Sequence, residues 1–132
     1  MATIKQFEDL EIWQKARILY QKVIALTNRS SIGKDYRFRS QLKAAAGSVM
    51  DNIAEGFERD SRLEFINFLS IAKGSCGEVR SQSYRALDEG YISLEEQSEL
   101  MNDCKTLGTD IANFIRYLNH SSIKGQKFTG RN

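Results

Sequence analysis

Residues 61–90 read SRLEFINFLSIAKGSCGEVRSQSYRALDEG and contain the clearest helix pattern in the chain. The apolar and small residues of this stretch recur at alternating steps of four and three, which places them on one face of a helix. They are Phe65, Leu69, Ala72, Cys76, Val79, Ser83 and Ala86. Ser61 and Glu64 have the spacing of a capping box at the helix start, and Gly90 suits its end. The pattern predicts a long helix with a seam of small residues that another helix can approach closely.

The same spacing continues on the C-terminal side of this stretch. Ser93 and Glu96 form a second capping box, and an apolar face then runs as far as Leu118. This pattern predicts another long helix.

Two further apolar faces lie on the N-terminal side. They predict one helix over residues 9–28 and another over residues 35–55, with Gly56 as the left-handed residue that ends the second. Residues 28–34, which include a glycine, are expected to form a loop.

Four long helices with short connections predict an all-α, antiparallel up-down-up-down four-helix bundle. The length of 132 residues suits one domain, and the absence of proline favours long helices. We expect the bundle to span residues 1–119. The polar residues 120–132 are expected to form a mobile C-terminal tail.

Residues that catalysis or metal binding would need are scarce. The only histidine is His120, so di-iron, paired-histidine haem and Ser-His or Cys-His sites are not expected within one subunit. Gly74 and Gly77 lie inside a predicted helix, where they indicate a close helix crossing rather than a phosphate loop. We therefore predict no enzymatic activity, no cofactor and no metal site.

The two cysteines fall on apolar rows of predicted helices. Cys76 and Cys104 belong to no CxxC motif, and buried, reduced thiols are the expected state. No apolar run is long enough for a membrane span, and the first 20 residues do not resemble a signal peptide. A cytoplasmic location without a membrane partner is therefore expected.

Charge is distributed unevenly, although the net charge is only +2. Residues 1–50 contain nine lysines and arginines against four acids, and residues 51–119 contain seven against thirteen. This asymmetry suggests either a polyanion partner or contact between the basic part of one subunit and the acidic part of another.

The basic residues of the N-terminal part form two groups that could contact phosphates. One group recurs every seven residues along the first predicted helix, and the other surrounds the start of the second. The candidate nucleic-acid-binding residues are Lys15, Lys22, Arg29, Lys34, Arg37, Arg39 and Lys43. The alternative is a solvated face, in which Glu11 pairs with Lys15 at i,i+4.

Some apolar residues lie beside the core rows rather than in them. The candidate oligomer-interface residues are Trp13, Tyr20, Ile66, Tyr84 and Leu87. Apolar surface outside a four-helix core is normally covered by another chain, and head-to-tail contacts can close into a ring. The alternative is a monomer with broad core faces.

Several polar residues cluster near Gly56. Asn52, Glu55 and Glu78 could serve as paired catalytic groups, but no third group orients them, so surface or subunit contacts are the preferred interpretation. An ion pair between Glu55 and Arg59 is expected.

The run Asn52-Ile53-Ala54-Glu55-Gly56-Phe57, followed by Arg59, Ser61, Glu64-Phe65, Phe68-Leu69, Ile71-Ala72, Gly74-Ser75 and Glu78, resembles the 23S ribosomal RNA intervening-sequence proteins of bacteria. The similarity also covers Phe7 to Trp13 and Gln41 to Ala45, while Met50-Asp51 departs from the family pattern. The resemblance implies a cytosolic four-helix bundle that assembles as a homopentamer and is encoded in some bacteria within insertions in ribosomal RNA genes. It implies no catalytic residues. A more distant resemblance is to the accessory protein of diversity-generating retroelements, a pentamer thought to bind nucleic acid and a reverse transcriptase.

These features predict a non-catalytic homo-oligomer that binds RNA or DNA through its basic face. The alternative is a scaffold that docks a protein partner, such as a reverse transcriptase or the product of a neighbouring gene. Charge alone does not separate the two, because phosphate and carboxylate attract the same cations.

Overall fold

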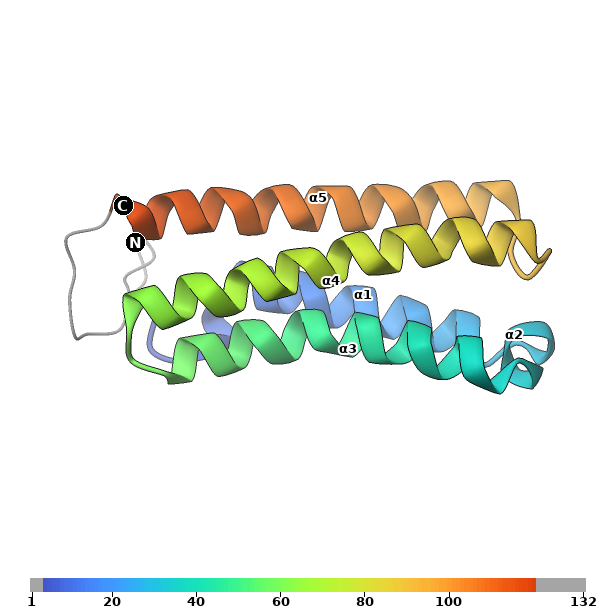
Figure 1. Ribbon diagram of the computed structural model, residues 1–132, viewed down its shortest axis with the longest axis horizontal. Coiled ribbons are helices and arrows are strands. Elements are labelled where there is room, and N and C mark those ends of the chain that lie inside the picture. The colour runs from blue at the N-terminus through green and yellow to red at the C-terminus, as the bar shows by residue number, and fades with distance from the viewer. Residues whose placement is uncertain (1–3, 121–132) are drawn as a thin grey trace.

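The computed structural model describes residues 4–120, with the side chain of Ser30 excepted, and its regular structure there is entirely helical. A short 3-10 helix, η1, comes first and five α-helices follow (Figure 1). Their bounds are η1 Phe7–Asp9, α1 Glu11–Thr27, α2 Ser30–Lys34, α3 Tyr36–Glu58, α4 Arg62–Asp88 and α5 Leu94–Asn119. The predicted C-terminal tail, residues 120–132, lies outside the described residues except for His120.

The four long helices lie side by side along the longest axis of the molecule (Figure 1). The helix α3 packs against α1 and α4, and α4 packs in turn against α5. The contact between α1 and α5 is much less extensive than the others. The α1–α3 side of the bundle therefore lies opposite the α4–α5 side.

The core contains the seam residues that the sequence predicts. Phe65, Leu69 and Val79 of α4 are almost fully buried, and Ile53 of α3 and Ile111 of α5 are buried with them. Burial of each large side chain of this kind stabilises the fold by about 1.5–3 kcal/mol. The 4-3 spacing identifies the residues that gain this stabilisation, so it predicts which helix faces form the core. Within residues 4–120, no helix is both long enough and apolar enough to span a membrane.

The predicted caps are present, although not all are complete. Ser93 and Glu96 exchange both bonds of a capping box at the start of α5. Ser61 accepts a bond from the Glu64 amide, but the Glu64 carboxylate lies 3.5 Å from Arg59 instead. Gly90 has a φ of 77° and follows α4 as predicted, because glycine adopts left-handed backbone without strain.

Gly56 does not end α3, so that prediction is wrong. The helix continues to Glu58, and the left-handed residue beyond it is Asp60, with a φ of 55°. A Cβ at Gly56 would lie 2.7 Å from Cβ of Phe68 and 3.0 Å from Cδ1 of Phe65. Gly56 therefore allows α4 to approach α3 rather than allowing α3 to stop.

Two other local predictions are also wrong. Residues 28–34 contain the short helix α2 instead of an open loop, because Ile32 is buried and anchors this turn against the core. Gly74 and Gly77 do not mark a close crossing within the chain, since a Cβ at either would meet no atom within 4 Å. Both glycines are exposed on α4.

Candidate nucleic-acid interface

The three cations that recur every seven residues along α1 and just beyond its end all contact carboxylates of α5. Lys15 Nζ lies 2.7 Å from Asp110 Oδ2 and 3.3 Å from Glu11 Oε1. Lys22 Nζ lies 2.6 Å from Asp103 Oδ2 and also reaches Glu99 at 3.2 Å. The cations spaced seven residues apart thus form a ladder of ion pairs between α1 and α5, two helices that contact each other less than the other neighbouring long helices do.

The ladder also affects proton binding by its members. Hydrogen bonds to Asp103 and Asp110 raise the pKa values of Lys22 and Lys15 above the ordinary lysine value, against the opposing effect of burial. Both ammonium groups are therefore charged at neutral pH, but their charge is already matched within the chain. These lysines are weaker candidates for phosphate contact than unpaired cations.

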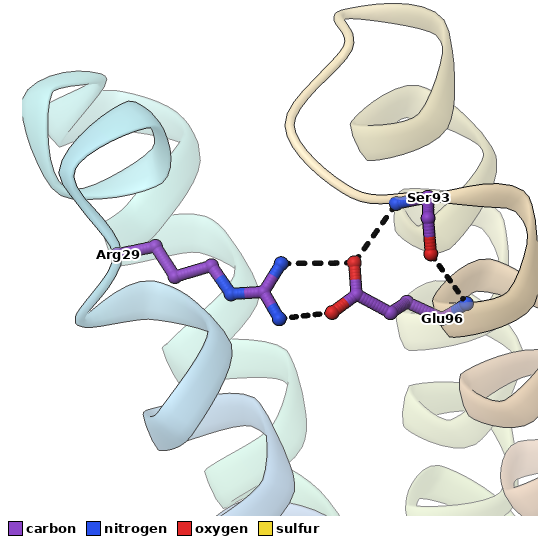
Figure 2. A network of polar contacts seen from close by, with 3 residues as sticks. All are labelled: Arg29, Ser93 and Glu96. Atoms are coloured by element: carbon purple, nitrogen blue, oxygen red, sulfur yellow. Dashed lines mark hydrogen bonds and ion pairs between the residues drawn. The ribbon is translucent and has the colours of Figure 1, made fainter.

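Arg29, the third cation, joins the end of α1 to the start of α5 (Figure 2). Its guanidinium donates to both carboxylate oxygens of Glu96, with Nη1 2.8 Å from Oε1. The same Oε1 accepts the amide of Ser93 at 2.8 Å. The bond from Arg29 and the backbone bond from Ser93 lower the pKa of Glu96 to about 2. One carboxylate therefore completes both an interhelical ion pair and a helix cap.

The four cations of α2 and α3 have a different environment. Within residues 4–120, Lys34, Arg37, Arg39 and Lys43 form no ion pair. Lys34 and Arg37 are exposed, and Arg39 and Lys43 are half-buried. We name these four residues the α3 patch; Arg39 and Lys43 are one turn apart, whereas Arg37 lies on the other flank of α3, because two residues span about 200° of a helix. The patch presents positive charge that the rest of the described chain does not neutralise.

Asp35, the acid nearest the α3 patch in sequence, accepts hydrogen bonds from groups outside the patch. Asp35 caps α3 by accepting the Phe38 amide at 3.1 Å and also accepts the hydroxyl of Tyr91. These two bonds lower the pKa of Asp35, and the bond to Asp35 raises the pKa of Tyr91 to about 12. Asp35 thus fixes the start of α3 without pairing with a cation of the patch.

A groove between α1 and α3 extends the patch. It has a volume of about 910 Å³ and is lined by Lys43 of the patch and by Arg17 of α1, with Tyr20 and Asp51 also in its wall. Sequence reasoning missed Arg17, because its position becomes meaningful only when α1 and α3 are neighbours. Asn52, also in the wall, donates to the backbone and hydroxyl oxygens of Ser48 at 2.8 Å, which fixes its amide.

The candidate oligomer-interface residues differ in exposure. Tyr84 is 47% exposed, whereas Trp13, Tyr20, Ile66 and Leu87 are half-buried. Trp13 packs edge-on against Phe7, with ring centroids 5.2 Å apart. More exposed apolar residues occur at positions that the sequence analysis did not select, namely Ile18, Tyr36, Leu63, Ile71 and Leu94.

Two acids considered for catalysis, and the two cysteines, lie in an ion pair, on an exposed helix face or in the core. Glu55 forms the predicted ion pair with Arg59 at 3.1 Å, and Glu78 is exposed on α4. Cys76 and Cys104 are free and buried as predicted, and burial raises both thiol pKa values to about 12. Such thiols are poor nucleophiles near neutral pH.

Comparison with known proteins finds a matching family and solved structures of similar fold. The family described as 23S rRNA-intervening sequence protein matches residues 8–113. The fold is also similar to that of a crystal structure from Bacteroides thetaiotaomicron, a protein with unknown function from the S23 ribosomal protein family. The two chains are 22% identical with a TM-score of 0.72, and the match covers 80% of this chain and 98% of the other. Among curated proteins, none matches this chain.

Proposed function

Because this chain belongs to the 23S rRNA-intervening sequence protein family, and because its α3 patch carries unpaired cations, we propose that it is a non-catalytic protein that binds RNA or DNA. The observation that carries the proposal is the contrast between the two groups of cations. Lys15, Lys22 and Arg29 contact carboxylates of α5, while Lys34, Arg37, Arg39 and Lys43 contact none in the described chain.

The α3 patch would contact phosphates and so would bind with little sequence preference. Arg17 adds a cation from the neighbouring helix, across the groove from Lys43. Tyr36, 72% exposed at the start of α3, adds an aromatic face on which a base can stack. Lys15, Lys22 and Arg29 act in this proposal as structural cations that fix α1 against α5.

The proposal includes the assembly of the antiparallel up-down-up-down bundle into a ring-like homo-oligomer, with five subunits as the resemblance implies. Leu63 of α4 is 67% exposed and Leu94 of α5 is 62% exposed, and a subunit contact would cover such side chains. A ring would repeat the α3 patch, so that weak phosphate contacts add through avidity. Part of the charge asymmetry is already matched inside one chain by the α1–α5 ladder, so exposed apolar residues support assembly better than charge does.

Retention of single-stranded RNA and DNA at two salt concentrations tests the binding. The patch variant R37A/R39A/K43A should bind at least tenfold more weakly at low salt. Its salt slope should also be smaller by about 2, the value for three lost single-strand phosphate contacts. The matched control K15A/K22A/R59A removes the same charge from cations that already contact carboxylates, and its affinity should change less than threefold. No retention of the wild type at low salt, or equal losses in both variants, contradicts the proposal.

The alternative is a scaffold that docks a protein, such as a reverse transcriptase or a neighbouring-gene product. The exposed Leu63 and Leu94 favour it, because leucine contributes to protein contacts and little to phosphate contacts. A pull-down that survives nuclease treatment and is lost in L63S/L94S would support the scaffold.

A further inference from the structure

A second cationic groove lies between α4 and α5, on the side of the bundle opposite the α1–α3 groove. Its volume is about 400 Å³. Four cations line it, two from each helix: Lys73 and Arg80 from α4, and Lys105 and Arg116 from α5. Among the described residues, no carboxylate lines this groove.

The spacing of these cations places them on one face of each helix. Lys73 and Arg80 are seven residues apart, which is two turns or about 10 Å along α4. Lys105 and Arg116 are eleven residues apart, which is three turns of α5. None of the four forms an ion pair within residues 4–120, although Arg116 donates to the neutral amide oxygen of Asn113.

The floor of the groove is made by residues without large side chains. Gly77 of α4 and Gly108 of α5 line it, and a Cβ at either would meet no atom within 4 Å. Thr109 and Ala112 also line it. A ligand can therefore approach the helix backbones closely while the cations reach it from both sides.

An aromatic residue follows the α4 cations along the same face. Tyr84 lies one turn beyond Arg80, is 47% exposed, and its hydroxyl donates to Sδ of Met101 on α5 at 3.0 Å. The hydroxyl contact fixes the ring across the α4–α5 seam. A fixed, exposed ring next to a basic groove is the arrangement that proteins use to stack bases of a single strand.

We propose that the α4–α5 groove binds single-stranded nucleic acid, with its phosphates on Lys73, Arg80, Lys105 and Arg116 and a base stacked on Tyr84. This inference rests on the proposed function only for the class of ligand, nucleic acid. The residues involved are different and lie on another side of the bundle. A contact between copies of the chain is the competing use of the groove. The composition disfavours it, since the lining residues include no aromatic or large apolar side chain of the kind that forms the core of a protein interface.

The sharpest test fills the groove without changing its charge. In G77L/G108L the new side chains occupy the floor, while all four cations remain. We expect at least fivefold weaker binding of a twelve-nucleotide single-stranded oligouridine, with an unchanged or higher unfolding temperature. The control G74L adds the same side chain to an exposed glycine of α4 outside the groove lining, and should bind as the wild type does.

A second pair of measurements applies even if the filled variant folds poorly. R80A/K105A should weaken binding at least fivefold, and its salt slope should fall by about 1.4, for two lost single-strand contacts. Placing the reporter Tyr84→Trp in a Trp13→Phe background should give fluorescence that the bound oligonucleotide quenches.

The outcomes separate this proposal from the preceding one. If R37A/R39A/K43A weakens binding but G77L/G108L and R80A/K105A do not, the α3 patch stands and the groove proposal is overturned. If only the groove variants bind more weakly than the wild type, the groove proposal is supported and binding through the α3 patch is contradicted. If G77L/G108L changes the subunit number in light scattering, the groove is a contact between copies and the proposal is overturned. If wild type binds no oligonucleotide, both proposals fail.

Discussion

Arg29, just after α1, donates to both carboxylate oxygens of Glu96 in the first turn of α5, and Glu96 completes the capping box of that helix at the same time. Two residues 67 positions apart in sequence thus connect one end of the N-terminal helix to the start of the C-terminal helix. Arg29 has the seven-residue spacing that made it a candidate phosphate ligand, but Glu96 already matches its charge within the chain.

The Glu96 carboxylate should make the fold sensitive to acid. Its pKa is about 2 in the folded chain against an ordinary value of 4.5. A lowered folded pKa contributes stability that is present above pH 4.5 and is lost as the pH falls toward 2. Glu96→Gln should lower the free energy of unfolding at pH 7 by roughly 1 kcal/mol, since the pair is partly exposed, and should flatten this acid dependence. Urea unfolding at pH 7, 4 and 3 measures both effects, and parallel losses in wild type and variant would contradict the assignment.

The glycines of α3 and α4 should respond oppositely to alanine. Gly56→Ala places a Cβ against Phe68 and Phe65, so we expect a loss of about 1–3 kcal/mol in the free energy of unfolding. Gly74→Ala meets open space on an exposed helix face and should raise stability by up to about 1 kcal/mol. Thermal and urea unfolding compare the two, and a neutral Gly56→Ala would show that α3 and α4 can separate at little cost.

The α1–α5 ladder should contribute to stability rather than to nucleic-acid affinity. A double-mutant cycle of Lys22→Ala and Asp103→Ala should give a coupling energy of about 0.5 kcal/mol at low salt that shrinks as salt is added. RNA retention by the Lys22→Ala variant should match that of the wild type. A loss as large as that caused by Lys43→Ala would return Lys22 to the phosphate-binding set that the sequence predicts.

The two buried thiols should resist modification until the chain unfolds. Burial raises the pKa values of Cys76 and Cys104 to about 12, so the reactive thiolate is scarce near pH 8. Raised folded pKa values also mean that their contribution to stability is present below about pH 9 and is lost as the pH rises toward 12. A colorimetric thiol reagent should react slowly at pH 8 and rapidly in denaturant. Rapid reaction in native buffer would show that the α4–α5 seam opens readily.

The seam of residues 61–90 shows how much of this fold is local. Phe65, Leu69 and Val79 recur on one face because the helix period is fixed, and their burial follows from that face alone. The capping box of Ser93 and Glu96 and the left-handed Gly90 are also determined within a few residues. Such features need no knowledge of which helices are neighbours.

Local sequence patterns therefore predicted the four long helices, their buried faces, most of their ends and the buried thiols. The partners of those helices follow only from how the helices pack in three dimensions. Lys15 meets Asp110 and Arg29 meets Glu96 across separations of 95 and 67 residues, and Gly56 serves the contact of α3 with α4 rather than a helix end. The reason is physical: periodicity and capping act within a few residues, whereas a cation's partner depends on which helix packs beside it. Which cations are left for a ligand thus follows from the packing of α1 against α5, a relationship that no local pattern encodes.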